Sequence, residues 1–186
     1  MSAVNREVNR AGVDLFLYLL DEAFRGPGIE ESNESQALLP NLATVPEPAW
    51  RAVLPGADRT IEKIVLHVGA CKVMYDDFAF GAGTLFWADR EVEPWPAGAA
   101  PMTEAIDWLG QVHQRLVDHI AELSDDDLSV LRLTNWGERR ETRWIASVML
   151  QHDLYHAGEI NHIRSLLSGD DRWQFEREMS ESGATG

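Results

Sequence analysis

The sequence predicts an all-α fold, specifically a four-helix bundle with an N-terminal helical extension. Four stretches place apolar residues at intervals of three and four, which is the period of a helix with one buried face. No region alternates apolar and polar residues over several segments, as the strands of a sheet would. The chain has 186 residues, of which 45% are hydrophobic, and this is enough to bury one continuous core.

The first two helices are predicted from their apolar faces and their end signals. The first covers about residues 12–25 and ends at the Gly26-Pro27-Gly28 sequence. A proline-containing region follows over residues 30–59, in which only residues 35–43 have helical character. The second helix begins after Thr60, whose hydroxyl suits an N-cap, and ends at Gly81 to Gly83. Both helices have an apolar stripe that can face a core.

The third helix is predicted over about residues 102–123, after a loop rich in proline, glycine and alanine at residues 93–101. Ser124 to Asp127 predicts a turn or a short helical segment, and residues 131–140 include an extended piece before Gly137. The fourth helix covers about residues 142–167 and ends at Ser168-Gly169. We therefore divide the chain into a helical extension (1–28), a bundle (29–168) and a partly disordered C-terminal tail (169–186).

Composition excludes several classes of partner. The formal net charge of −15 argues against nucleic acid, because phosphates would be repelled. The longest apolar run, residues 15–20, is too short to cross a bilayer. The N-terminus lacks the pattern of a secretory signal, and the single cysteine, Cys71, excludes a disulfide within the chain. We expect a cytoplasmic protein that binds a small-molecule substrate, with no membrane and no nucleic-acid partner.

The candidate site rests on histidines placed where the helical period demands apolar residues. Relative to Ile145 on the fourth helix, His152 falls at about −20°, His156 at about +20° and Glu159 at about −40°. The two imidazoles therefore lie one above the other on the buried face. His67, on the second helix, also borders the core. Neutral imidazoles are good ligands for zinc, nickel, iron or copper, and three of them with a vacant position make a catalytic type of site.

Other interpretations of these residues stay open at this point. A single histidine on an apolar face is more often a hydrogen-bonded core residue than a ligand. His113 also lies mid-stripe on the third helix, so it could replace His67 as a ligand, line a pocket or donate a buried hydrogen bond. Asp153 is expected to face solvent or another helix, and Cys71 to act as a small buried hydrophobe. Periodicity alone does not choose between His67 and His113.

Two segments resemble a known family. They are RTIEKIVLHVGACKVMYDDFAFG, with a histidine deep in the second helix, and WIASVMLQHDLYHAGEINHIRSLL, with an HxxxHxGEI core. Together they resemble the DinB superfamily of metal-binding bundles, over about residues 35–168. This resemblance implies a DinB/YfiT-like four-helix bundle in which His67, His152 and His156, the histidine triad, ligate one divalent ion, zinc or nickel. Relatives often form dimers, which implies a homodimer here.

The resemblance also implies a reaction class. Relatives include mycothiol-dependent maleylpyruvate isomerase and bacillithiol S-transferases. The first hypothesis is therefore a metal-dependent enzyme that acts with a low-molecular-weight thiol such as mycothiol or bacillithiol, as an S-transferase or isomerase. The alternatives are a non-catalytic bundle with a structural metal and a metal-dependent hydrolase. No catalytic residue is assigned, although Glu159 could accept the second ring N–H of a ligand histidine, accept a proton or join the ligands.

Overall fold

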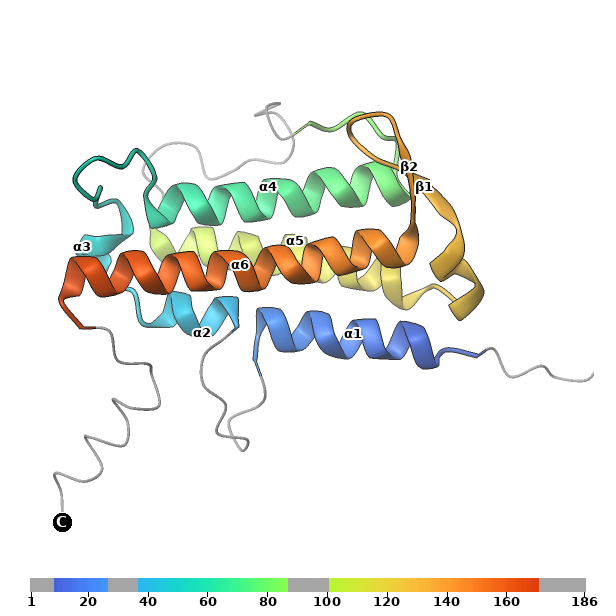
Figure 1. Ribbon diagram of the computed structural model, residues 1–186, viewed down its shortest axis with the longest axis horizontal. Helices are drawn as coiled ribbons and strands as arrows, with labels where there is room; N and C mark the ends of the chain where they lie inside the picture. Colours follow the sequence, from blue (N-terminus) through green and yellow to red (C-terminus); the bar gives the residue numbers. More distant parts are fainter. Residues whose placement is uncertain (1–8, 27–36, 87–100, 171–186) are drawn as a thin grey trace, which may run out of the picture.

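A computed structural model describes residues 9–26, 37–86 and 101–170, and in these residues it is an all-α bundle (Figure 1). The long helices are α1 (Ala11–Phe24), α4 (Ile61–Phe80), α5 (Met102–Ala121) and α6 (Thr142–Ser168). The short helices α2 (Leu38–Ala43) and α3 (Glu47–Trp50) lie between α1 and α4 in the chain. The predicted fold class is confirmed, and the four long helices begin and end within about two residues of their predicted bounds.

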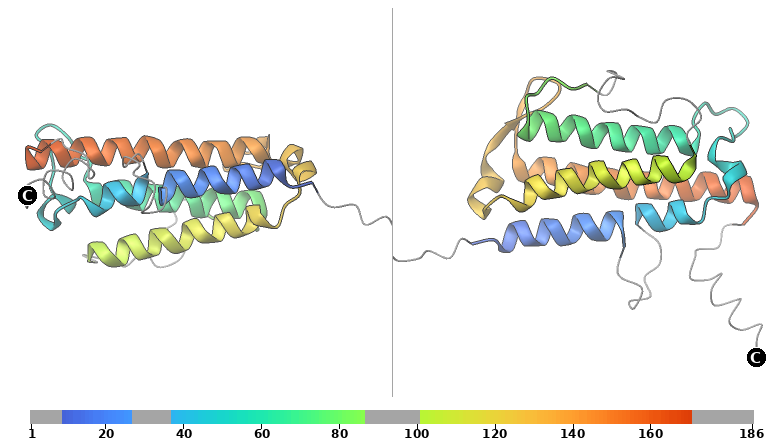
Figure 2. Two further views of the ribbon diagram at one scale, coloured as in Figure 1. Left: turned by 90° about the horizontal axis from the view of Figure 1, so that it is seen from below. Right: turned by 180° about the vertical axis from the view of Figure 1, so that it is seen from behind.

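Helices α1 and α2 follow each other along α6 and together occupy one side of the bundle (Figures 1 and 2). The buried side chains Val13 and Leu20 of α1 pack with Leu116 of α5 and Met149 of α6. These residues form one of two main clusters of buried hydrophobic side chains. The other cluster is larger and contains Leu38 and Leu42 of α2 together with Ile160 of α6. Helix α1 therefore contributes to the core along the first part of α6, and α2 does so along its later part.

The helix ends that position the site are fixed by side chains close to them. The Thr60 hydroxyl accepts a hydrogen bond from the Lys63 backbone N–H at 3.1 Å and caps α4. At the C-terminal end of α4, the Asp77 carboxylate accepts hydrogen bonds from the backbone N–H groups of the residues that follow the helix, Ala82, Thr84 and Leu85. Gly169 ends α6 with φ of +66°, a left-handed conformation that glycine adopts without strain. These local contacts define where α4 begins and where α4 and α6 end.

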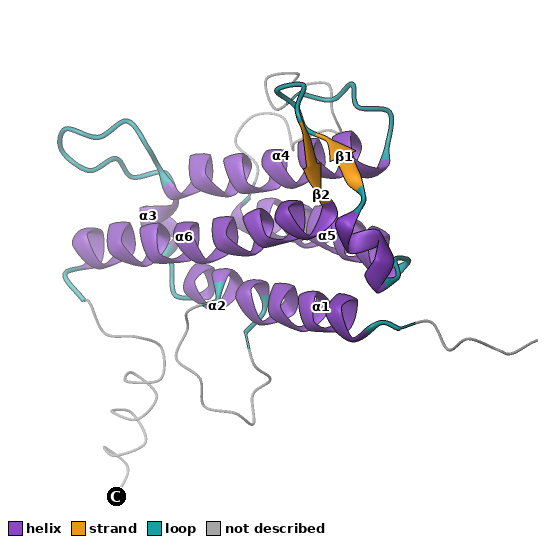
Figure 3. Ribbon diagram, turned by 45° about the vertical axis from the view of Figure 1, so that its right-hand side comes forward, coloured by secondary structure: helices purple, strands orange, loops and turns teal. Residues whose placement is uncertain are grey.

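A small hairpin connects α5 to α6 (Figure 3). The strands β1 (Leu131–Leu133) and β2 (Arg139–Glu141) are antiparallel, with Leu131 opposite Glu141. A 3-10 helix, η1 (Asp125–Ser129), precedes them and begins with a capping box between Ser124 and Asp127. The short helical segment and the extended piece before Gly137 agree with the sequence, whereas the second strand was not predicted.

Some predictions fall on residues that the structure does not describe. They concern the first eight residues of the extension, the loop at 93–100 and the tail beyond residue 170. The boundary at residue 28 also lies outside the described residues, so the division into extension, bundle and tail stays a prediction. None of the helices in the described residues is long and apolar enough to span a membrane.

Candidate metal centre

The ring nitrogens of the histidine triad converge between α4 and α6. His67 lies on α4, and His152 and His156 lie one turn apart on α6. His152 Nε2 is 3.1 Å from His67 Nε2 and 3.2 Å from His156 Nε2. The ring centroids of His67 and His156 are 5.0 Å apart. His152 Nε2 thus lies between one ring nitrogen of His67 and one of His156, although the donors that all lie within 4.8 Å of one another are those of His67, Cys71 and His152.

These distances suit ligands of a common ion. Two nitrogens bound at about 2.0–2.1 Å to a tetrahedral zinc ion lie roughly 3.3 Å apart, close to the two separations found here. Hydrogen bonding between the rings does not account for both short separations. A neutral ring nitrogen carries either one N–H or one lone pair in the ring plane, so it makes one such bond. His152 Nε2 contacts two other ring nitrogens, and one ordinary hydrogen bond accounts for only one of them. The donor set therefore fits a divalent ion that favours imidazole.

Burial favours the neutral, metal-binding form of each imidazole. Desolvation lowers the pKa of His152 to about 3, and the nearby His156 and His67 rings and the Lys72 ammonium act in the same direction. The pKa values of His67 and His156 are also lowered, in both cases mainly by burial. At neutral pH the three imidazole rings are therefore uncharged, and each has a nitrogen lone pair available to a metal ion.

Glu159 lies directly against one of these rings. Its Oε2 is 2.7 Å from His156 Nδ1, and its Oε1 accepts a hydrogen bond of 2.9 Å from the Arg59 guanidinium. A carboxylate at this distance accepts a hydrogen bond from Nδ1–H of the neutral ring, which leaves the lone pair on Nε2. Arg59 in turn fixes the carboxylate from the loop before α4. The contact that the sequence suggested for Glu159 is present, and Arg59 is an addition that the helical period did not reveal.

The three rings differ in exposure in a regular way. His156 is 3% exposed, His152 is intermediate and His67 is exposed at the surface. The cluster therefore extends from the core to solvent, with α6 supplying its buried end and α4 its outer end. The outer end of the cluster is therefore exposed to solvent at His67.

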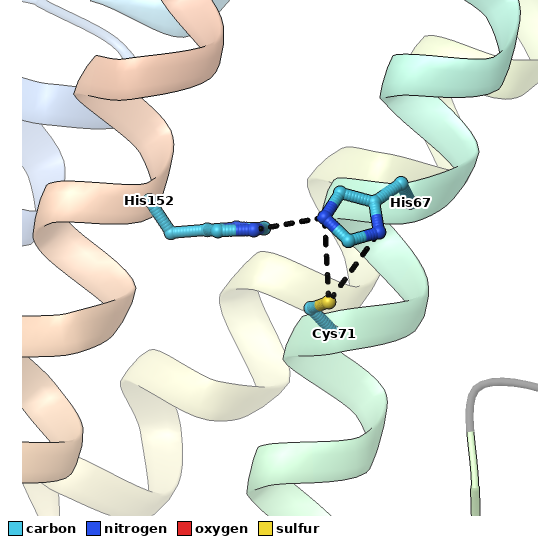
Figure 4. Close-up of side chains that lie close together, drawn as sticks. All are labelled: His67, Cys71 and His152. Carbon is cyan, nitrogen blue, oxygen red and sulfur yellow. Dashed lines mark hydrogen bonds between the residues drawn. The ribbon is translucent and has the colours of Figure 1, made fainter.

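A sulfur atom lies beside the same cluster (Figure 4). Cys71 follows His67 by one turn of α4, and its Sγ is 3.8 Å from His67 Nδ1 and 3.9 Å from Nε2. Donor atoms of His67, Cys71 and His152 all lie within 4.8 Å of one another. Burial raises the pKa of the Cys71 thiol to about 11. Cys71 is buried as expected, but its place beside the histidines was missed, although the i, i+4 spacing from His67 could have revealed it.

His113 occupies a different part of the core. Its ring stacks on Phe24 at a centroid distance of 3.7 Å, and its Nδ1 lies 3.9 Å from Asp153 Oδ2. Within the described residues, neither ring nitrogen of His113 has a hydrogen-bond partner. The sequence left His113 as a competitor of His67, whereas the structure brings His67 to the ring nitrogens of α6.

Asp153 does not face solvent, which corrects one of the two orientations expected for it. Its side chain is fully buried against α4, where Oδ2 accepts a hydrogen bond of 2.7 Å from the Lys72 ammonium. Lys72 is also fully buried. The pair lies next to the candidate site in both helices, since Lys72 follows Cys71 and Asp153 follows His152. A helical period places charged residues outside, so this pair was not predicted.

A helical bundle with clustered histidines on two adjacent antiparallel helices, α4 and α6, defines the class of protein, and comparison with known families identifies it further. The sequence model of the DinB superfamily matches residues 32–160, which is more than half of the chain and includes all three histidines. The chain belongs to the DinB superfamily. Helix α1 precedes the matched region, although it packs into the bundle. No curated protein matches the chain significantly.

Proposed function

We propose that the protein binds one divalent metal ion, zinc or nickel, through Nε2 of His67, His152 and His156. The observation that carries this proposal is the pair of Nε2 separations, 3.1 and 3.2 Å, that meet at His152. Membership of the DinB superfamily supports it as well. Alkaline-earth ions prefer oxygen donors, so an imidazole set favours a transition metal or zinc.

We further propose that the site serves a metal-dependent enzyme acting with a low-molecular-weight thiol, of the S-transferase or isomerase type. The thiol class, mycothiol or bacillithiol, follows from the family resemblance. A bound ion would supply a positive charge that holds a thiol as its nucleophilic thiolate near neutral pH. The exposed His67 edge gives a thiol access to the cluster from solvent. The cytoplasmic location and the homodimer stay predictions.

The residues of the chain have separate tasks in this proposal. The Glu159 carboxylate holds His156 with its proton on Nδ1, and Arg59 holds Glu159. The buried position of His156 excludes water from the inner side of the site. His67 is exposed and forms the side that faces an incoming molecule. The arrangement therefore combines a rigid inner wall with an accessible outer edge.

A structural ion is the second candidate function. The observation in its favour is that the donors come from both α4 and α6, so that an ion would tie these helices together. In this case the bundle would be non-catalytic, and removing the ion would lower its melting temperature sharply. A hydrolase remains the third hypothesis from the sequence, and no contact in the described residues favours it over the first.

Elemental analysis of purified variants tests the metal site. Wild-type protein is expected to contain about one equivalent of metal, whereas His67→Ala and His156→Ala lose it. His162→Ala is the matched control, because His162 is an exposed histidine on the same helix, α6. If neither triad variant loses metal, the proposed site is wrong.

Thiol binding is tested separately from metal binding. Cobalt-substituted protein is titrated with mycothiol and with bacillithiol, and the visible absorption of the cobalt is recorded. A saturable change that is absent in His156→Ala supports the thiol-dependent enzyme. If cobalt-loaded protein responds to neither thiol but loses stability on chelation, the structural role is the correct one.

A further inference from the structure

We infer that Cys71 Sγ is a fourth ligand of the ion held by the histidine triad. This inference rests on the proposed function, because it adds a protein donor to the same ion. It concerns a residue outside the three histidines that the family resemblance implies. A Cys-His₃ donor set is of the nitrogen and sulfur type that zinc prefers, and it has the number of ligands that a closed tetrahedral site requires.

The first step is the position of the sulfur. The i, i+4 spacing on α4 puts Cys71 and His67 on the same face, toward α6 (Figure 4). Around a tetrahedral zinc ion, a sulfur and a nitrogen ligand lie roughly 3.6 Å apart. The separations between Sγ and the His67 nitrogens are 3.8 and 3.9 Å. The separation from His67 is therefore within a few tenths of an ångström of the value for two ligands of one ion, and the exposed His67 ring can turn without disturbing the core.

The second step is the environment that holds the sulfur there. The Cys71 side chain is 8% exposed and packs in a small cluster with Met74 and Phe78 on the same helix. Its direction is thus set by packing, and the sulfur lies within 4.8 Å of donor atoms on both His67 and His152. The sulfur therefore lies between α4 and α6, beside the rings of His67 and His152 (Figure 4).

The third step is the chemistry of coordination. The S–H bond is replaced by a sulfur–metal bond, the proton is released to solvent, and neither sulfur nor metal changes its oxidation state. Cys71 then occupies the position that a substrate thiol would otherwise take, so a substrate thiol must displace it or add as a fifth ligand. The inference therefore gives the resting site a protein thiolate that competes with the substrate.

Cobalt spectroscopy provides a direct test, because Cys71 is the only cysteine in the sequence. Metal-free protein is loaded with cobalt(II) in buffer that contains no thiol. The wild type is expected to show a sulfur-to-cobalt charge-transfer band in the near ultraviolet. Cys71→Ser and Cys71→Ala should lack this band, retain the visible bands of histidine-bound cobalt, and bind cobalt at least about tenfold more weakly.

The outcomes separate this inference from the proposed function. If wild-type protein binds cobalt in a manner that His67→Ala abolishes, but shows no charge-transfer band, Cys71 is not a ligand and the histidine site stands. If wild-type protein binds no cobalt, both proposals are wrong. The band is measured on the wild type itself, so the test does not depend on the folding of the cysteine variants.

Discussion

The imidazole of His156 and the carboxylate of Glu159 face each other across one turn of α6, with Nδ1 and Oε2 2.7 Å apart. This contact holds the proton of the neutral ring on Nδ1. Glu159→Gln should therefore weaken zinc affinity by about 10- to 100-fold without changing the helical content. Competition with a chromophoric chelator measures the affinity. Glu104→Gln, on the exposed surface of α5, is the control and should bind zinc like the wild type. Equal affinities in all three proteins would remove Glu159 from the site.

The buried ion pair between Lys72 and Asp153 should be costly to break from either side. Lys72→Met leaves the Asp153 carboxylate buried without its partner, and this is expected to lower the free energy of unfolding by about 3–5 kcal/mol. Asp153→Asn should have a similar effect, because it leaves the Lys72 ammonium buried without a negative partner. Urea denaturation of metal-free protein provides the measurement, because bound metal would add its own stabilisation.

A double variant separates the pair from the packing around it. Lys72→Met combined with Asp153→Leu removes both charges, so it should be less destabilising than the sum of the single variants. Strict additivity would contradict a direct interaction between the two side chains.

His113 should make the folded state sensitive to acid. Burial, followed by the charges of Lys72 and Arg25, lowers the pKa of His113 from 6.5 to about 2. Between these values the unfolded chain takes up a proton at this residue and the folded chain does not, so stability falls as the pH falls. From pH 8 to pH 5 the loss through His113 is about 2 kcal/mol. Denaturation of His113→Phe at both pH values should show a correspondingly smaller difference than the wild type.

Two helical glycines should respond to alanine with opposite signs. A Cβ at Gly69 on α4 would lie 2.0 Å from the Trp108 ring of α5, whereas a Cβ at Gly110 would meet nothing within 4 Å. Gly69→Ala is expected to destabilise the protein by about 1–3 kcal/mol through overpacking. Gly110→Ala should stabilise it by about 0.5–1 kcal/mol, because alanine favours the helix. Thermal unfolding monitored by circular dichroism measures both effects, and a stabilised Gly69→Ala variant would contradict the close packing of α4 on α5.

Most of the fold could be predicted because long amphipathic helices repeat their signal over many residues. The end signals at Thr60 and Gly169 were also readable, since each caps a helix by a local mechanism. Helix α3 was missed because it has four residues, too few to show a period. Its proline, Pro48, was taken as evidence against a helix, yet a proline in the first turn gives up no helical hydrogen bond. The second strand of the hairpin was also missed, because its three residues are too few to show an alternating pattern.

The site could be predicted only as far as one helix allows. The spacing of His152, His156 and Glu159 places them on one face, and the contact between His156 and Glu159 follows from it. Which histidine approaches from another helix depends on how α4 and α5 rotate against α6, and a helical period contains no such information. The burial of Lys72 and Asp153 was hidden for a related reason, since each looks like a surface residue until its partner is known.

The N-terminal end of α1 is held by residues that lie more than 100 positions later in the sequence. Arg10, its N-cap residue, provides no side-chain cap, and the Gly12 and Val13 N–H groups donate to the Asp125 carboxylate instead. Arg10 itself donates to the carbonyls of Ala121 and Leu123 at the end of α5. Contacts this distant in sequence form late, because a long loop must close first. Helix α1 is thus expected to dock last during folding and to exchange its amide hydrogens before α4 and α6 do.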